Sequence, residues 1–271
     1  MDKGIYTALS GGIAKGHEIE LIANNLANAN TPGFKRDTGT FNEYLTELRK
    51  PDDVRGVQRE ITAATLFEGR PVGDKSFVEM DSIYTDYRQG TVQHSGRDLD
   101  IALEGKGFLE VKTPAGVWYT RQGNLTVSAD GRLVTNNGYP VLARGGAQGE
   151  GDAEGRVIRL GIGKVEITSD GILKQNGQKV AQISLQEFQE DQWLEKVGNS
   201  YFRNTDPKNI KAETAATRVH QGYVESSNVN PIKEMTRLIE ATRAYESHMQ
   251  AVKTYQEIDL KSVNEIVRGN Y

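Results

Sequence analysis

The first apolar repeat of the chain lies near its N-terminus and has the period of a helix. Between Asp2 and Asn28 there is no proline, and apolar or small residues recur at alternating spacings of four and three. These positions are Ile5, Leu9, Gly12, Gly16, Ile19, Ala23 and Leu26. Such a heptad repeat is typical of a helix that packs along one side against another helix. The run from Asn28 to Gly33 predicts the helix end, because asparagine and glycine adopt left-handed backbone readily and Pro32 cannot continue a helix.

A second heptad repeat lies near the C-terminus. Asn230 and Pro231 predict a helix start, because asparagine caps a helix and proline is tolerated in the first turn. No proline follows, and the repeat positions alternate three and four apart at Met235, Leu238, Thr242, Tyr245, Met249 and Val252. Continued to Val267, this helix would be about 55 Å long, which is too long for a small globule.

Between the two repeats the pattern changes to short apolar runs separated by turns. We expect residues 36–95 to form an extended connector with short strands, residues 96–205 an antiparallel β domain, and residues 206–229 a return linker. Residue pairs that supply the positive φ angles of tight hairpins recur in the β domain. They are Asp130-Gly131, Asn137-Gly138, Asp170-Gly171 and Asn176-Gly177.

Together these patterns predict a mainly β fold with terminal α-helices. The helices within residues 1–35 and 230–271 would form one discontinuous coiled-coil stalk, with the β domain inserted between them. Apolar positions that remain uncovered would pack against other subunits, which predicts a polymer with the stalks inside and the β domain outside. The expected assembly interface consists of Ile5, Leu9, Ile19, Asn24, Asn25, Leu26, Asn28, Met235, Leu238, Thr242, Tyr245, Met249 and Val252.

Composition narrows the functional classes. Apolar residues make up 37% of the 271 residues and aromatic residues 7%, low values that suit an elongated protein with much exposed surface. A formal net charge of −4 argues against a nucleic-acid partner, and the lack of cysteine excludes disulfides and thiolate metal sites. No apolar run reaches the roughly 18 residues of a membrane span, so we expect no membrane insertion. The stretch Met1–Gly12 lacks the basic and apolar regions of a cleaved secretory signal.

Few residues suggest chemistry. The four histidines are scattered without the paired spacing of a metal site. Asp98, Asp100 and Glu104 offer carboxylates for glycoside hydrolysis or for a calcium site, but acidic residues that alternate along a strand usually face water. Neither a phosphate-binding loop nor a nucleophile motif occurs. We therefore expect no enzymatic activity, no metal and no cofactor.

The two ends of the chain carry runs that resemble the signatures of the flagellar rod, hook and hook-junction family. The first run extends from Ala23 to Lys35 (ANNLANANTPGFK). The second extends from Gly222 to Asn230 (GYVESSNVN) and is followed by RAYE at residues 243–246, with Thr242 where many members have glutamine. The runs LDIALEGKGF, YTRQGNL and DGRLVT in the middle of the chain are similar to the β domain of rod proteins in this family.

The resemblance implies a structural subunit of the bacterial flagellar basal-body rod, the axial drive shaft for motility, which spans the periplasm. It implies polymerisation through the terminal helices and export by the flagellar type III apparatus without a cleaved signal. Its partners would be other axial proteins, further copies of itself and the export apparatus. The run from Asn228 to Ile239 is most similar to the proximal-rod type, and the distal-rod type is the alternative. In another class, a secreted β-rich adhesin or carbohydrate-binding module with helical stalks would explain the turns but not the terminal runs.

Polar and turn residues within the terminal runs are candidates for structural roles. Asn24, Asn25 and Asn28 would either fix the register of packed helices, because an unpaired buried amide is costly, or serve only to end the helix. Other residues would stop the helix and anchor the chain around it. These structural-motif residues are Pro32, Gly33, Phe34, Gly222, Asn228 and Asn230.

Overall fold

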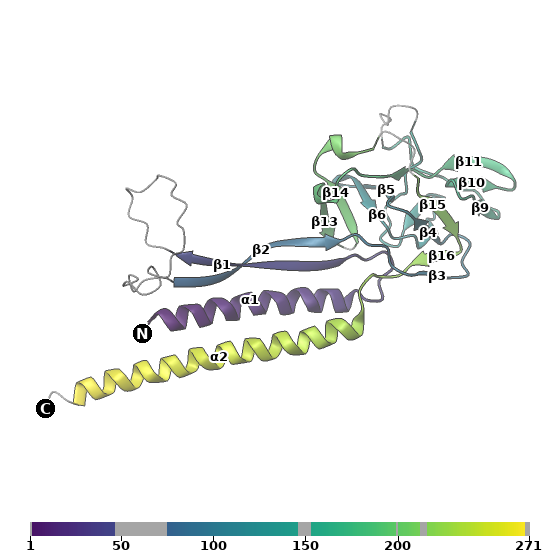
Figure 1. Ribbon diagram of the computed structural model, residues 1–271. Coiled ribbons are helices and arrows are strands. Elements are labelled where there is room, and N and C mark those ends of the chain that lie inside the picture. Colours follow the sequence, from purple (N-terminus) through teal and green to yellow (C-terminus); the bar gives the residue numbers. More distant parts are fainter. Residues whose placement is uncertain (1, 47–74, 146–152, 199, 212–215, 269–271) are drawn as a thin grey trace, which may run out of the picture. The chain divides into compact units, whose positions relative to one another are not determined.

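The computed structural model describes residues 2–46, 75–145, 153–198, 200–211 and 216–268 (Figure 1). Its contacts divide the chain into two compact units. The helical unit comprises Met1–Ala23, Gly39–Ile83 and Met235–Tyr271, and the β unit comprises Asn24–Thr38 and Tyr84–Glu234. Each unit therefore combines segments that are far apart in the sequence.

The helical unit contains most of two long helices, α1 (Asp2–Ala27) and α2 (Pro231–Arg268), which confirms the predicted terminal helices. Glycines on α1 face large side chains on α2 in the pairs Gly4 with Tyr255, Gly11 with His248 and Gly16 with Tyr245. Because the α2 number falls as the α1 number rises, the two helices run antiparallel. Among the described residues, neither helix combines the length and the apolar character needed to cross a bilayer.

The helical unit also contains most of a two-stranded ribbon, β1 (Arg36–Thr46) paired with β2 (Lys75–Asp86). Strands of 11 and 12 residues are longer than the short strands predicted for the connector. Their sequences mix polar and apolar residues without strict alternation, so the signal that marks a strand is weak. On the side of α1, the Lys15 ammonium lies 5.9 Å from the centroid of the Phe41 ring. Residues 47–74 lie outside the described residues.

The β unit is built from short antiparallel strands, which confirms a mainly β middle of the chain. Its largest sheet has the order β12 (Leu185–Gln186), β5 (Phe108–Thr113), β6 (Gly116–Thr120), β14 (Tyr201–Asn204), β13 (Leu194–Gly198). A second sheet has the order β11 (Gln178–Gln182), β10 (Ile172–Gln175), β9 (Val165–Ile167). A further pair joins β7 (Leu125–Val127) to β8 (Leu133–Thr135). Short 3-10 helices are η2 (Asp191–Trp193) and η3 (Pro207–Asn209).

Two further strand pairs involve the segment for which the sequence predicts a return linker. Strand β15 (Arg218–Gln221) pairs with β4 (Ile101–Glu104), and β16 (Tyr223–Glu225) pairs with β3 (Val92–His94). Gly222 lies between β15 and β16 with a φ of 78°, a left-handed conformation that lets the chain change direction between the two pairs. The start of the C-terminal motif is therefore part of the folded β unit.

The largest sheet separates two apolar clusters, because alternate residues of a strand point to opposite faces. Leu109 and Val111 of β5 belong to the larger cluster, whereas Phe108 belongs to a mainly aromatic one. The aromatic cluster also contains Tyr119, Phe188, Leu194 and Phe202. Burial on both faces explains why β5 is buried at nearly every position.

Candidate functional site

The two terminal motifs meet inside the β unit, at the turn that follows α1. Gly33 has a φ of 68°, and its N–H group donates to the carbonyl oxygen of Glu225 at 2.8 Å. A Cβ atom on Gly33 would lie 2.5 Å from the carbonyl carbon of Arg121. Both the backbone conformation and the available space therefore require glycine. The N-terminal motif lies directly against the C-terminal motif and against the end of β6.

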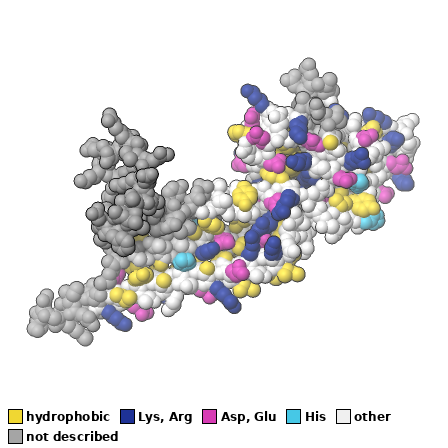
Figure 2. Space-filling view, in the orientation of Figure 1, with side chains coloured by type: hydrophobic (Ala, Val, Ile, Leu, Met, Phe, Trp, Pro, Cys, Tyr) yellow, Lys and Arg dark blue, Asp and Glu magenta, His cyan; other side chains and the backbone are white. Residues whose placement is uncertain are grey.

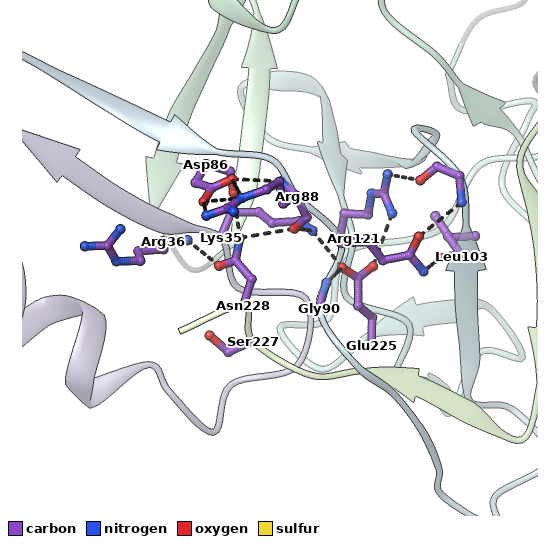
Figure 3. A network of polar contacts seen from close by, with 12 residues as sticks. Lys35, Arg36, Asp86, Arg88, Gly90, Leu103, Arg121, Glu225, Ser227 and Asn228 are labelled. Atoms are coloured by element: carbon purple, nitrogen blue, oxygen red, sulfur yellow. Dashed lines mark hydrogen bonds and ion pairs between the residues drawn. The ribbon is translucent and has the colours of Figure 1, made fainter. Parts of the chain in front are cut away.

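Next to this turn, Lys35, Arg121 and Glu225 form a buried ion cluster (Figure 3). Lys35 Nζ lies 2.6 Å from Glu225 Oε1, and Arg121 Nη1 lies 3.2 Å from Glu225 Oε2. The side chains of Lys35, Arg121 and Glu225 are 0%, 3% and 1% exposed. Within the cluster, two buried cations share one carboxylate.

Backbone groups also bond to the ion cluster, although Arg121 Nε is buried without a hydrogen-bond partner. Lys35 Nζ donates to the carbonyl oxygen of Arg88 at 2.8 Å, and the N–H group of Gly90 donates to Glu225 Oε1 at 2.9 Å. Burial lowers the pKa of Lys35, because the ammonium loses its water, and the nearby Glu225 carboxylate opposes this shift. Burial lowers the pKa of Arg121 for the same reason. The cluster depends on Glu225, because without it the two buried cations would lose the carboxylate that both of them contact.

Two asparagine side chains, one from each terminal motif, bind the backbone at the start of β1. Asn228 Oδ1 accepts from the N–H group of Arg36 at 2.8 Å, and its Nδ2 donates to the carbonyl oxygen of Asp86 at 2.7 Å. Asn25 exchanges two hydrogen bonds with the backbone of Asp37, at 2.8 and 2.9 Å. The Asn25 amide thus pairs with one residue of β1, whereas the Asn228 amide links the backbone of β1 to that of β2.

Phe34 is buried and is covered by Lys196 of β13. Lys196 Nζ lies 3.8 Å from the centroid of the Phe34 ring, a cation–π contact. The same ammonium donates to the carbonyl oxygen of Lys35 at 2.8 Å and to Asp37 Oδ2 at 2.7 Å. Burial lowers the pKa of Lys196, and Asp37 opposes this shift. Phe34 therefore holds the N-terminal motif against the largest sheet.

The first turn of α2 binds the same segment. Asn230 caps the helix, because its Oδ1 accepts from the N–H group of Lys233 at 3.2 Å. Arg36 Nε lies 2.7 Å from Oε1 of the buried Glu234. The segment that leaves α1 is thus bonded to the segment that enters α2.

The residues predicted for the assembly interface differ in exposure. Leu9, Met235, Tyr245 and Asn24 are exposed, Val252 and Asn25 are buried, and the others are half-buried: Ile5, Ile19, Leu26, Asn28, Leu238, Thr242 and Met249. Asn28 donates its amide to the carbonyl oxygen of Asn24 at 2.9 Å, within the end of the helix. Figure 2 shows hydrophobic side chains exposed along the helices. The role of these residues in assembly stays a prediction.

Sequence reasoning missed the buried ion cluster. Lys35 and Glu225 lie inside the two terminal runs, and Arg121 lies in the middle run, yet a charged residue in a motif predicts a solvated position unless its partner is known. The site binds parts of the chain to one another rather than presenting reactive groups. Among the described residues, no group of three or more His, Cys, Asp or Glu side chains is placed to hold a metal ion.

Comparison with known proteins relates these regions to flagellar proteins. Residues 5–35 match the family described as flagella basal body rod protein. Residues 102–180 match the flagellar hook protein FlgE/F/G D1 domain, and residues 220–265 match the flagellar basal body rod FlgEFG protein C-terminal family. The matched regions contain Lys35, Arg121 and Glu225, one in each.

Relatives match over nearly the whole chain. The flagellar basal-body rod protein FlgF of Caulobacter vibrioides is 34% identical over 270 residues, which cover 100% of both chains. FlgF of Rhizobium meliloti is 31% identical over 91% of this chain and 90% of its own. FlgG of Caulobacter vibrioides is 32% identical over 94% of this chain and 96% of its own. On this evidence of sequence and structure, the chain belongs to the flagellar basal-body rod protein family.

Proposed function

We propose that this protein is a structural, non-enzymatic subunit of the bacterial flagellar basal-body rod, of the proximal-rod FlgF type. It polymerises with other axial proteins through α1 and α2 to build the drive shaft for motility. The observation that carries this proposal is the set of large apolar side chains that both helices expose to water. Exposed apolar surface of this kind is typical of a surface that another protein covers.

The joined terminal motifs support an arrangement around the rod axis. In this arrangement α1 and α2 form an antiparallel coiled-coil stalk near the axis, and the β unit, inserted between them in the sequence, lies at larger radius. The buried ion cluster and the two asparagine contacts hold the end of α1 and the beginning of α2 in one place. Helices that leave the β unit at a fixed point can pack in register with the helices of neighbouring subunits.

The connector would brace neighbouring subunits in the rod. The long ribbon of β1 and β2 supports this role, because a two-stranded ribbon is marginally stable in water and gains from further contacts. The region of the connector from Pro51 to Gly73 lies outside the described residues. We further propose export through the flagellar type III apparatus without a cleaved signal, and a location in the part of the rod that spans the periplasm.

The distal-rod FlgG type is the second candidate. It is favoured by the FlgG relatives, whose identities approach those of the FlgF relatives. The two candidates differ in where the subunit lies along the rod. An adhesin, the rival from another class, would not require the motifs at the two ends to join.

Deletion of the gene in the native organism tests the function. We expect non-swimming cells whose basal bodies lack a complete rod, with both defects restored by the wild-type gene. Immunogold labelling of a tagged subunit in purified basal bodies then separates the candidates, because the FlgF type predicts gold near the inner-membrane end of the rod. Swimming deletion cells with normal rods would contradict the proposal.

A further inference from the structure

Five of the exposed apolar side chains of the helical unit fall into two patches, one on each helix. Ile83, Tyr245, Tyr255, Ile258 and Leu260 are exposed outside these patches. The α1 patch consists of Tyr6, Leu9 and Ile13, which are 51%, 37% and 55% exposed. Spacings of three and four place these residues on one side of α1. The α2 patch consists of Met235 and Ile239, which are 45% and 55% exposed and lie one turn apart.

The two patches are far apart in one chain. Gly4 faces Tyr255 and Gly11 faces His248, so Leu9 lies level with about residue 250 of α2. Ile239 is therefore about 16 Å further along the helix pair, at a rise of 1.5 Å per residue. No single copy can bring the α1 patch onto its own α2 patch while its helices keep this register.

The surroundings of the α1 patch indicate an apolar cover. From Gly4 to Ala14 the sequence has no Asp, Glu, Lys or Arg, although surface helices normally carry such residues on their outer face. The α2 patch is different, because Arg243 follows it by one turn. An uncharged patch that contains a tyrosine and an apolar patch beside an arginine are complementary, because an aromatic ring attracts a cation.

We propose that the α1 patch of one copy docks on the α2 patch of a second copy, a contact that rests on the proposed function. Copies in a rod point the same way, so the two helices would meet antiparallel, as they do within the chain. Leu9 then packs against Ile239, and Ile13 packs against Met235. Both contacts form together because the two residues on each helix are four positions apart. Tyr6 lies level with Thr242 in this register, next to Arg243.

This contact has the symmetry that a rod requires. It joins two different surfaces, so a row of copies always has an unused α1 patch at one end and an unused α2 patch at the other. A contact of this kind gives an open polymer unless the rotation between copies happens to close a ring. A pairing of identical patches would instead stop at a dimer.

Disulfide cross-linking tests the contact, because the natural chain contains no cysteine. The full-length Leu9→Cys/Ile239→Cys variant is produced in cells that lack the wild-type gene, and the cells are treated with a mild oxidant. A disulfide requires Cα atoms within about 7 Å, so these positions cannot pair within one copy. We expect a ladder of dimers, trimers and larger species on a non-reducing gel, and the same from Ile13→Cys/Met235→Cys.

Matched variants make the result specific. Each single cysteine variant should give no ladder, and a mixture of Leu9→Cys chains with Ile239→Cys chains should stop at dimers. The Leu9→Cys/Glu240→Cys variant moves one cysteine about 100° around α2 and should cross-link at least tenfold less. Swimming without oxidant shows independently that rods assemble. Swimming cells in which neither double variant gives a ladder would overturn the contact but not the proposed function, whereas normal rods in cells without the gene would overturn the function itself.

Discussion

At the scale of single residues, the ion cluster is where the two terminal motifs and the β domain depend on one another. A buried ion pair adds little net stability, but removing one partner leaves an uncompensated charge in the interior. Glu225 is the only carboxylate of the cluster and also accepts from a backbone N–H group. Its two cations come from different parts of the sequence.

The Glu225→Gln variant should lower the free energy of unfolding of the β unit by about 3–5 kcal/mol, because two buried cations lose their counter-charge. Urea unfolding of the purified full chain measures this loss. The matched control is Glu195→Gln, since Glu195 pairs with Arg203 at the surface and should contribute less than about 1 kcal/mol. Equal losses from the two variants would contradict the role assigned to Glu225.

The Lys35→Met variant should cost clearly less than Glu225→Gln, because it leaves one cation with one carboxylate. Burial lowers the pKa of Lys35 in the folded chain below its ordinary value of 10.5. The unfolded chain therefore binds the Lys35 proton more tightly than the folded chain does. Stability of the wild type should therefore rise with pH between the lowered pKa and 10.5, and Lys35→Met should remove this part of the rise. Unfolding curves at several alkaline pH values test both expectations; identical pH slopes would contradict them.

The sequence predicts the place of the site better than its chemistry. Asn25, Asn228 and Gly33 belong to the terminal runs, and those runs do meet. Their partners could not be predicted, because Asp37, Arg36 and Arg121 are brought to them by tertiary packing. A local pattern contains no information about which distant strand supplies the partner.

At the scale of elements, regular periodicity decides what can be predicted. The heptad repeats predict α1 and α2, and the Asx-Gly turns predict the short strands of the β unit. The length of β1 and β2 and the pairing of β15 and β16 were missed. Those strands mix polar and apolar residues, so their own sequence pattern does not reveal them. Their extended conformation depends on the strand with which each one pairs.

The turn after α1 provides an element-scale prediction. Gly33→Ala should destabilise the β unit by more than 2 kcal/mol, because the left-handed strain of about 1–2 kcal/mol is added to a collision with the Arg121 backbone. Gly138→Ala is the matched control, since Gly138 has a φ of 82° but open space around its Cβ position. Thermal unfolding of both variants measures the difference. Equal shifts would show that the collision relaxes without cost.

The packing of α1 on α2 provides a second prediction at the scale of elements. Met249 is half-buried, and its sulfur would lie 3.6 Å from a Cβ atom on Gly12. Met249→Asp should abolish swimming and leave the β unit folded, because a carboxylate buried without a partner costs several kcal/mol. The neighbouring Gln250 is exposed, so Gln250→Asp should swim normally. Soft-agar swimming and proteolysis of the purified variants compare them; normal swimming of Met249→Asp would exclude this side of α2 from the packed surface.

At the scale of the whole molecule, both units contain segments from the two halves of the chain. The helical unit needs both terminal helices, and the β unit needs the residues that follow α1 and precede α2. The helices expose apolar surface, whereas the β unit buries two apolar clusters of its own. This difference in burial predicts that the helices, and not the β unit, gain most from assembly.

The central claim is that this subunit builds the rod through its terminal helices. Electron cryomicroscopy of basal bodies from the native organism tests it most directly. We predict density for α1 and α2 in the inner wall of the rod, packed against neighbouring subunits, and density for the β unit at larger radius. A rod whose density contains no copy of this chain, or one in which the β units form the inner wall, would contradict the account.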